Sequence, residues 1–206
     1  MRSLQPVTPW LDALASDAPS PGGGAAAALN ASMGASLVCM VCNLTLGKEA
    51  FAQHEDTLRG VLAAAEAARH RALALAEADA EAFSAYMATV KLPRSTPAER
   101  AAKAAASTAA LLAAARVPLD TALLAAEIIG LCEQLLGRSN PHVISDVAVA
   151  AQNARCALDA SVVNVEINLA SMKDASQRAA LAAELATATP AATFCSRKLS
   201  GGSMLL

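Results

Sequence analysis

Aromatic residues are scarce in this chain of 206 residues, which has one Trp, one Tyr and three Phe although 55% of its residues are hydrophobic. The core must therefore consist of Ala, Leu and Val, and such small side chains require closely packed helices or strands. No segment alternates apolar and polar residues as a strand would, whereas apolar residues recur at helical spacing along most of the chain. The sequence predicts a single-domain, all-α helical bundle.

Clusters of one charge are also missing. The 16 Lys and Arg and 18 Asp and Glu residues are interspersed, with a net charge of -2, so the chain lacks the basic stripe typical of nucleic-acid binding. Metalloprotease, Walker and serine-hydrolase motifs are absent. These absences argue against a nucleic-acid partner and against the common hydrolase and nucleotide-binding classes.

The cysteines do not form a disulfide framework, because there are five of them and they are scattered. This usage is typical of reduced thiols in a cytoplasmic protein. Cys39 and Cys42 have the spacing of a metal-ligand pair, but they lie in an apolar segment without a second pair. We therefore expect them to pack in the core, and we expect no metal.

The longest uncharged run covers the thirty residues between Asp17 and Lys48. Its length would allow a membrane span. Alanine predominates over Leu and Ile, however, polar residues interrupt the run, and the sequence offers no comparable second span. The first twenty residues also lack the leucine-rich core of a signal peptide. We expect a buried central helix over residues 25–46 of a soluble, cytoplasmic protein with no membrane contact.

The remaining helices follow from periodicity, caps and breaks. We expect helices over residues 3–16 and 53–90, a break at 91–95, a helix from Pro97 to Leu136 that is kinked or split at Pro118, a helix from Ser145 to Met172, and a last helix ending near Ala186. Ser145 is expected to cap its helix. These expectations give one domain over residues 1–186 and a flexible tail over residues 187–206.

A glycine-rich loop, Ser20-Pro21-Gly22-Gly23-Gly24, precedes the central helix. Glycines leave the N–H groups of a helix start unshielded, and such groups bind anions or carbonyl oxygens. The loop is therefore a candidate binding site.

Polar side chains form a stripe on the helix that begins near residue 145. Asn153, Asn164 and Asn168 follow Asp146 by 7, 18 and 22 residues, which places all four within a narrow arc of one helix face. The stripe indicates either bonds to neighbouring loops or a ligand groove. Asp146 and Asn164 are about 27 Å apart at 1.5 Å per residue, so they could share one ligand only if two subunits packed antiparallel. This predicts a site at a homodimer interface.

Asp79 is a second candidate acid, in the segment Glu77-Ala78-Asp79-Ala80-Glu81-Ala82-Phe83. Glu81 is two positions away and faces the opposite side of a helix. Asp79 is thus either a solvated surface residue or a site residue, and Glu81 does not share its face.

Seven segments together resemble the cyclodeaminase/cyclohydrolase family, which includes the C-terminal domain of formiminotransferase-cyclodeaminase and stand-alone methenyltetrahydrofolate cyclohydrolases. The resemblance is collinear from about Pro6 to Ala186. The segments are Pro19–Gly24, Met40–Lys48, Asp79–Phe83, Lys91–Pro93, Val117–Leu119, Ser139–Asp146 and Asn164–Leu169. The family commonly has an asparagine where this chain has His142.

The resemblance implies an all-helical homodimer that binds tetrahydrofolate derivatives without metal or nucleotide and acts on the one-carbon unit between N5 and N10. No formiminotransferase domain accompanies the chain, so we expect a methenyltetrahydrofolate cyclohydrolase. The alternatives are a formimidoyltetrahydrofolate cyclodeaminase and a non-enzymatic helical oligomerisation module.

Site roles follow from the resemblance and from the residues above. Asp146 is the first candidate for the general base and Asp79 the second, with Lys48 as a proton donor or electrostatic partner. The expected substrate-binding residues are Pro21, Gly22, Gly23, Gly24, Asn43, Asn140, Ser145, Asn164 and Asn168.

Overall fold

The computed structural model describes the backbone of residues 7–200 and the side chains of residues 7–190. Within this part of the chain all regular structure is helical, which confirms the all-α prediction. The helices are α1 (Thr8–Leu14), α2 (Gly23–Asn43), α3 (Glu55–Val90), α4 (Pro97–Leu135), α5 (Ile144–Ser171) and α6 (Ala175–Ser200), with 3₁₀ turns η1 (Glu49–His54) and η2 (Pro141–Val143).

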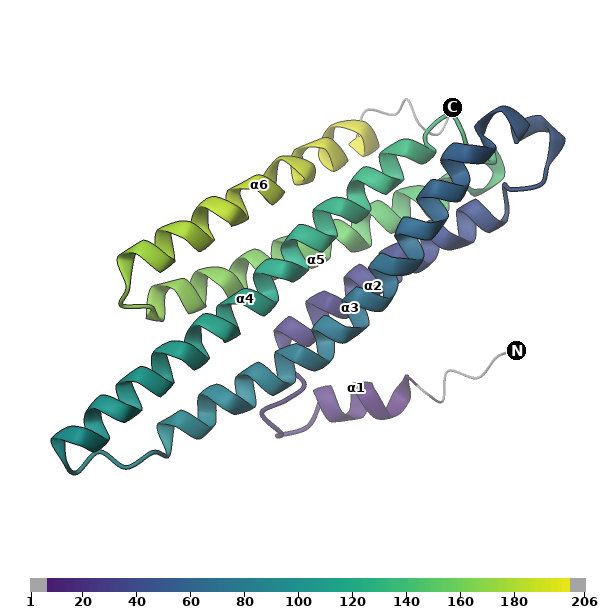
Figure 1. The fold of residues 1–206 in the computed structure, drawn as a ribbon. Helices are drawn as coiled ribbons and strands as arrows, with labels where there is room; N and C mark the ends of the chain where they lie inside the picture. Colours follow the sequence, from purple (N-terminus) through teal and green to yellow (C-terminus); the bar gives the residue numbers. More distant parts are fainter. Residues whose placement is uncertain (1–6, 201–206) are drawn as a thin grey trace.

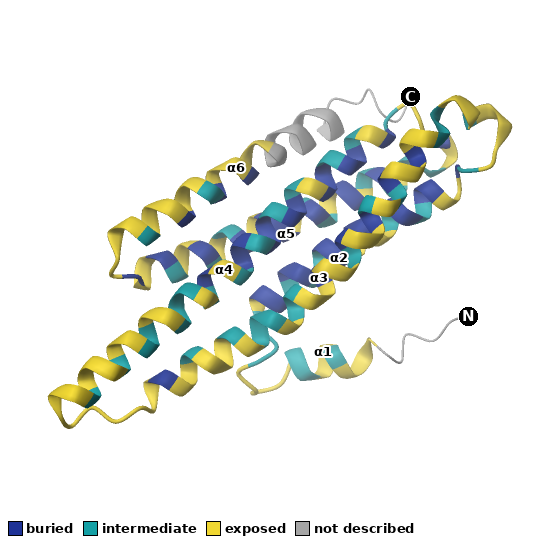
Figure 2. Ribbon diagram, in the orientation of Figure 1, coloured by how far each residue is buried: buried dark blue, intermediate teal, exposed yellow. Residues whose placement is uncertain are grey.

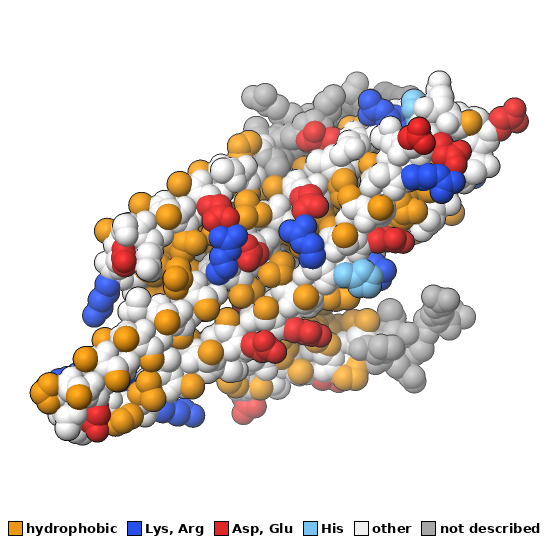
Figure 3. Space-filling model, viewed as in Figure 1, with side chains coloured by type: hydrophobic (Ala, Val, Ile, Leu, Met, Phe, Trp, Pro, Cys, Tyr) orange, Lys and Arg blue, Asp and Glu red, His pale blue; other side chains and the backbone are white. Residues whose placement is uncertain are grey.

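Helices α2, α3, α4 and α5 form the bundle, and α6 lies along α4 and α5 (Figure 1). The buried residues gather on the inward faces of these helices (Figure 2). On the face seen in Figure 3, acidic and basic side chains lie next to one another. Arg116 of α4 bonds Glu184 of α6 at 2.7 and 2.8 Å. Helix α1 has no buried residue and lies apart from the bundle (Figure 1).

Helix α2 is the central helix, and its small residues allow close helix contacts. Its buried side chains include five alanines: Ala25, Ala27, Ala28, Ala31 and Ala35. A Cβ atom on Gly34 would lie 3.0 Å from the Ala150 carbonyl oxygen and 3.3 Å from the Ala154 nitrogen, both on the backbone of α5. The backbones of α2 and α5 therefore approach so closely at Gly34 that a methyl group there would require the α5 backbone to shift.

Replacing Gly34 with Ala is expected to lower the free energy of unfolding by about 1–3 kcal/mol, because backbone atoms of α5 must move to admit the methyl group. Gly60→Ala is the matched control, since Gly60 lies in α3 with no atom within 4 Å of its Cβ position. That variant should be neutral or more stable, because Ala favours a helix by about 1 kcal/mol over Gly. Denaturant unfolding measures the free energy of unfolding of both variants. Equal changes in the two variants would contradict the close contact between α2 and α5 at Gly34.

Among the described residues, two helices, α2 and α4, are long and apolar enough to cross a membrane, which corrects the expectation of a single candidate span. The most apolar window of α2 is 61% buried inside the bundle, and that of α4 is 39% buried. The burial of α2 agrees with its prediction as a central core helix.

Three helix boundaries differ from the sequence expectation. Helix α4 continues through Pro118, which is buried within it, so the helix is not split there. Helix α5 begins at Ile144 after Val143, and Ser145 lies in its first turn without capping it. Helix α6 runs to Ser200, with Leu185 and Ala188 buried, so the expected boundary near Ala186 falls inside a packed helix. The rest of the expected tail, residues 201–206, lies outside the described residues, as do residues 3–6 of the first expected helix.

Candidate active site

The glycine loop and α3 meet at the start of α2. Gly22 is the extended N-cap residue of α2 and has no side chain to cap it. Instead, the Asp79 carboxylate of α3 accepts a hydrogen bond from the Ala25 N–H through Oδ2, at 3.0 Å. An acid far along the sequence thus caps the central helix, and the positive end of the helix dipole faces this carboxylate.

Gly24 is what allows Asp79 to come so close. A Cβ atom on Gly24 would fall on the carboxylate, 2.8 Å from Oδ2 and nearer still to Cγ and Oδ1. By contrast, a Cβ atom on Gly23 would lie 3.9 Å from its nearest neighbour, Asn164 Nδ2, and Gly22 has nothing within 4 Å. Of the three glycines, Gly24 is therefore the one that the position of Asp79 requires.

Asp79 is half-buried, and burial raises the pKa of its carboxyl group above the usual 3.8. The hydrogen bond from the Ala25 N–H acts in the opposite direction and lowers this pKa, but it does not cancel the effect of burial. A carboxylate with a raised pKa is a stronger base than an exposed carboxylate, which suits Asp79 to accept a proton.

Asn164 and Asn168 project from α5 toward the same region, and backbone carbonyls hold both amides. Asn164 Nδ2 donates to the Ala160 carbonyl at 2.9 Å. Asn168 Nδ2 donates to the Ala114 carbonyl of α4 at 3.1 Å. In an unbroken helix the Ala114 carbonyl would accept the N–H of residue 118, but Pro118 has none. The proline inside α4 thus frees a carbonyl that orients Asn168.

These groups line a cavity of about 430 Å³ between the start of α2 and helices α3, α4 and α5. This volume lies within the range of small-molecule sites. From the predicted site it contains Gly22, Gly23, Gly24, Asp79, Asn164 and Asn168. We call it the glycine-loop cavity.

Apolar residues that the sequence did not single out complete the glycine-loop cavity: Phe83, Tyr86, Leu111 and Ile167. Phe83 and Tyr86 are two of the few aromatic residues in the chain, and flat rings in a cavity favour flat ligands. The sequence could have indicated Tyr86, because Tyr86 follows Asp79 by seven residues and so lies on the same face of α3.

The other predicted site residues, apart from Pro21 in the glycine loop, lie at the opposite end of the bundle. Asn43, Lys48, Asn140, Ser145 and Asp146 cluster around the end of α2 and the start of α5, about 30 Å from the glycine loop at 1.5 Å per residue. None of them lines the glycine-loop cavity, and neither does Pro21. Within one chain, the acid in the cavity is Asp79 and not Asp146.

Asn140 has a structural role at that far end. Its backbone N–H donates to Thr45 Oγ1 at 3.1 Å, and its side-chain oxygen accepts the His142 N–H at 3.1 Å. Thr45 in turn donates to the Val41 carbonyl at 2.7 Å, and both Thr45 and Asn140 are buried. These bonds hold the segment before α5 against the end of α2, and they position the first turn of α5, where Asp146 lies exposed in part.

Cys39 and Cys42 are buried in α2, as predicted. Burial raises the pKa of Cys39, and it raises the pKa of Cys42 to about 12. Thiols with raised pKa values remain protonated near neutral pH, whereas metal ligation requires the thiolate. In the part of the chain that the structure describes, no three His, Cys, Asp or Glu residues come close enough to hold a metal ion.

An all-helical bundle with a carboxylate and two amides around the glycine-rich start of its central helix defines a recognisable class. The chain belongs to the formiminotransferase-cyclodeaminase family, whose sequence model matches residues 6–187. This confirms the family expected from the seven sequence segments.

Several proteins similar to this chain have names that state an activity. The chain is 41% identical to methenyltetrahydrofolate cyclohydrolase of Methylorubrum extorquens, over 84% of each protein. It is 34% identical to the formimidoyltransferase-cyclodeaminase of Gallus gallus, of which it covers 31%. Its fold matches the crystal structure of formiminotetrahydrofolate cyclodeaminase from Thermotoga maritima with a TM-score of 0.84 and 29% identity, over 95% of this chain and 93% of that one.

Proposed function

We propose that this protein is a folate enzyme that hydrolyses 5,10-methenyltetrahydrofolate to 10-formyltetrahydrofolate. The observation that carries the proposal is the half-buried Asp79 carboxylate, whose pKa is raised, in a cavity with oriented amides and aromatic rings. The similarity to a methenyltetrahydrofolate cyclohydrolase over 84% of both chains supports this choice of reaction.

Asp79 is suited to move the proton that this hydrolysis requires. Its Oδ2 is held by the Ala25 N–H, which leaves Oδ1 to accept a proton from water. The water oxygen bonds to the methenyl carbon, and its proton passes to Asp79. The bond from that carbon to N5 then breaks while Asp79 returns the proton to N5. The second water proton leaves to solvent as the formyl C=O forms.

The remaining cavity groups would bind and orient the folate. The free side-chain oxygens of Asn164 and Asn168 can accept hydrogen bonds from pterin N–H groups, and the glycine-loop N–H groups can donate to the pterin carbonyl. Phe83 and Tyr86 offer ring faces for the pterin or the aminobenzoyl group. The reaction consumes only water, so we propose that it needs neither metal nor further cofactor, and that it takes place in the cytoplasm without membrane contact.

A formimidoyltetrahydrofolate cyclodeaminase is the second candidate. In that reaction N10 attacks the formimino carbon and ammonia leaves, so an acid must supply a proton to the leaving group. The raised pKa of Asp79 would help it to hold that proton. The similar crystal structure from Thermotoga maritima carries that activity in its name. A purely structural oligomerisation module would not require the oriented groups of the cavity.

Absorbance measurements separate these candidates. Purified protein should accelerate the loss of the methenyl absorbance when it is mixed with 5,10-methenyltetrahydrofolate. With formiminotetrahydrofolate it should produce little or no methenyl absorbance. Formation of methenyltetrahydrofolate with release of ammonia, without hydrolysis of the methenyl compound, would replace the proposed function with the second candidate.

We further propose that the protein is a homodimer in which the far end of one subunit completes the glycine-loop cavity of the other. Helices α2 and α5 both run between the glycine loop and the far end of the subunit, and both expose large apolar side chains. These are Met33 on α2, and Val149, Val163 and Ile167 on α5, the last 63% exposed. Asn30 of α2 and Cys156 of α5 touch at 3.5 Å, so these two helices share one face.

Antiparallel packing of this α2–α5 face would place Asp146 of one subunit near Asp79 of the other. Helices α2 and α5 run in opposite directions, with the glycine loop at one end and Asp146 at the other. A two-fold axis near the middle of the face exchanges these ends. Both candidate acids could then contact one ligand, although they are far apart within a chain.

Mixing two inactive variants tests the shared site. Asp79→Asn and Asp146→Asn should each be inactive alone. In an equal mixture that exchanges subunits, about half of the dimers are heterodimers, and each heterodimer contains one intact site of two. The mixture should therefore regain about a quarter of wild-type activity. Glu81→Gln mixed with wild type serves as the control for subunit exchange, since Glu81 is exposed and outside the cavity. No recovery in exchanged mixtures, or full activity of Asp146→Asn alone, would contradict a shared site.

A further inference from the structure

Pro118 lies in the middle of α4, where a proline disfavours the helix. A proline inside a helix has no N–H for the carbonyl four residues earlier, and its ring clashes with that carbonyl. In α4 this carbonyl belongs to Ala114, yet the helix runs on from Pro97 to Leu135 with Pro118 buried inside it. Helix α4 therefore tolerates the proline, and the Ala114 carbonyl is left without a backbone partner in its own helix.

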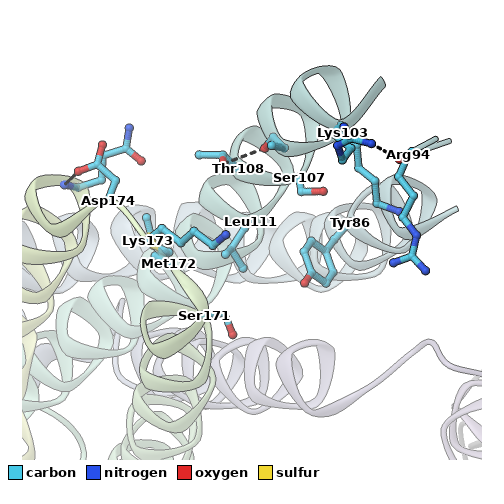
Figure 4. A pocket seen from close by; sticks show the side chains of 13 residues that line it. Tyr86, Arg94, Lys103, Ser107, Thr108, Leu111, Ser171, Met172, Lys173 and Asp174 are labelled. Carbon is cyan, nitrogen blue, oxygen red and sulfur yellow. Dashed lines mark hydrogen bonds between the residues drawn. The ribbon is translucent and has the colours of Figure 1, made fainter. Parts of the chain in front are cut away.

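Asn168 of α5 supplies the donor that the Ala114 carbonyl lacks. Its Nδ2 donates to this carbonyl at 3.1 Å. Both residues line the glycine-loop cavity. Three residues away on each helix, Leu111 of α4 and Ser171 of α5 line the same cavity and the space that adjoins it (Figure 4). Helices α4 and α5 thus run antiparallel along one wall of the glycine-loop cavity, and the Asn168 bond joins them within that wall.

This bond decides which end of the Asn168 amide faces a ligand. A carbonyl oxygen can only accept hydrogen bonds, so the amide must turn its NH2 group toward Ala114. Oδ1 is then the free end, and it accepts no hydrogen bond from the described residues. Asn164 differs, because its Nδ2 donates at 2.9 Å to the Ala160 carbonyl of its own helix, which also has a backbone donor. The orientation of Asn168 therefore depends on a carbonyl that only Pro118 leaves open.

We propose that Pro118 is a positioning residue for substrate binding. By withholding an N–H group, it makes the Ala114 carbonyl hold the Asn168 amide with Oδ1 toward the cavity, where Oδ1 accepts a hydrogen bond from an N–H group of the pterin. The inference rests on the proposed function, because it takes a folate as the ligand. Asn168 then selects the donor edge of the pterin ring, and Pro118 acts on the substrate only through Asn168.

Replacing Pro118 with Ala tests this role. The variant supplies the missing N–H, so the Ala114 carbonyl can bond within α4 and the Asn168 amide is released to rotate. The dissociation constant for tetrahydrofolate, measured by calorimetry, should rise about tenfold, as expected for the loss of one hydrogen bond to a ligand. KM should rise with it, while kcat changes less than about threefold because Asp79 does not move. The Tm should stay the same or rise, because Ala favours a helix over Pro.

Pro118→Val and Pro190→Ala are the control variants. Val is close to Pro in volume, so the same loss of affinity in Pro118→Val as in Pro118→Ala would assign the effect to the N–H group and not to lost packing. Pro190 lies inside α6, is exposed and does not line the glycine-loop cavity. Pro190→Ala should therefore keep wild-type affinity. Wild-type affinity in Pro118→Val, or an equal loss in Pro190→Ala, would overturn the proposal.

A double-mutant cycle separates positioning of Asn168 from a general packing effect. Asn168→Ala should weaken tetrahydrofolate binding about as much as Pro118→Ala does. The double variant should bind no more weakly than Asn168→Ala alone, because Pro118 acts only through the side chain that Asn168→Ala removes. Additive losses of affinity would mean that Pro118 affects binding by another route, and the proposal would fail.

The Asn168 amide can also be observed without a ligand, by nuclear magnetic resonance of protein that contains isotope-labelled asparagine. Its side-chain NH2 signal is identified by its absence from Asn168→Ala. In wild type these protons should exchange slowly with solvent, because one of them is bonded to the Ala114 carbonyl. They should exchange faster in Pro118→Ala. Equal exchange in the two proteins would overturn the proposal.

The positioning role and the proposed reaction fail separately. If methenyltetrahydrofolate is hydrolysed but Pro118→Ala keeps the wild-type KM and dissociation constant, the positioning role is wrong and the reaction stands. If Pro118→Ala and Asn168→Ala weaken tetrahydrofolate binding without additivity but wild type hydrolyses nothing, the reaction is wrong and the positioning role stands. If wild type does not bind tetrahydrofolate, both are wrong.

Discussion

Replacing Asp79 with Asn is expected to lower kcat by about a hundredfold or more while folate still binds, because the amide keeps the shape of the side chain but cannot accept the proton from water. The Asn side-chain oxygen can still accept the Ala25 N–H, so the start of α2 should remain capped. Stopped-flow or steady-state absorbance at the methenyl band measures the loss. Glu81→Gln is the control, since it neutralises an exposed acid of the same helix outside the cavity.

The same variant should not be less stable at neutral pH. Burial raises the pKa of Asp79 above 3.8, so the folded protein holds this proton more tightly than the unfolded chain does. As pH rises above 3.8, the unfolded chain ionises first, and the contribution of Asp79 to the free energy of unfolding falls until the pH passes the folded pKa. Asn does not ionise, so the Asp79→Asn variant does not lose this part of the free energy of unfolding. An inactive Asp79→Asn protein with an equal or higher Tm fits the account, whereas near-wild-type turnover would remove Asp79 from catalysis.

Replacing Gly24 with Ala is expected to have nearly as large an effect on turnover. The new methyl group would occupy the place of the Asp79 carboxylate, whose Oδ2 lies 2.8 Å from the Cβ position and whose Oδ1 lies closer still. Asp79 must then rotate away, and a displacement of about 1 Å at a catalytic group can reduce the rate about a hundredfold. Loss of the cap on α2 should cost about 1 kcal/mol of stability.

Two measurements distinguish displacement of Asp79 from unfolding in the Gly24→Ala variant. Circular dichroism should show wild-type helix content, and kcat should fall far more than the free energy of unfolding. Gly60→Ala, in α3 with open space at its Cβ position, should retain full turnover. Full activity of Gly24→Ala would mean that the carboxylate position does not matter for the reaction.

The sequence predicted the glycine loop, Asp79, Asn164 and Asn168 separately, and the fold brings them together. Helical periodicity assigned Asn164 and Asn168 to one face, because they are four residues apart on α5. It could not reveal that Asp79 caps α2, because that bond joins residues 54 positions apart and depends on how α3 packs against α2. Sequence reasoning thus named residues that line one cavity, but it could not give the contacts between them.

Asp146 and Pro118 show why the rest could not be predicted. Helix rise predicts that Asp146 lies about 27 Å from Asn164, but it does not show which other helix places an acid beside Asn164; that acid is Asp79 of α3. Pro118 predicted a kink or a split in α4; the helix is not split, and the freed Ala114 carbonyl binds Asn168 instead. In both cases the outcome depends on neighbouring helices, which a local pattern does not specify.

A crystal structure with bound 5-formyltetrahydrofolate, a stable folate that carries the one-carbon unit, tests the central claim most directly. We expect the pterin in the glycine-loop cavity, with the one-carbon unit within about 3 Å of Asp79 Oδ1 or bridged to it by one water. A folate bound elsewhere, with Asp79 beyond the reach of a single water, would contradict the assignment of this cavity as the active site.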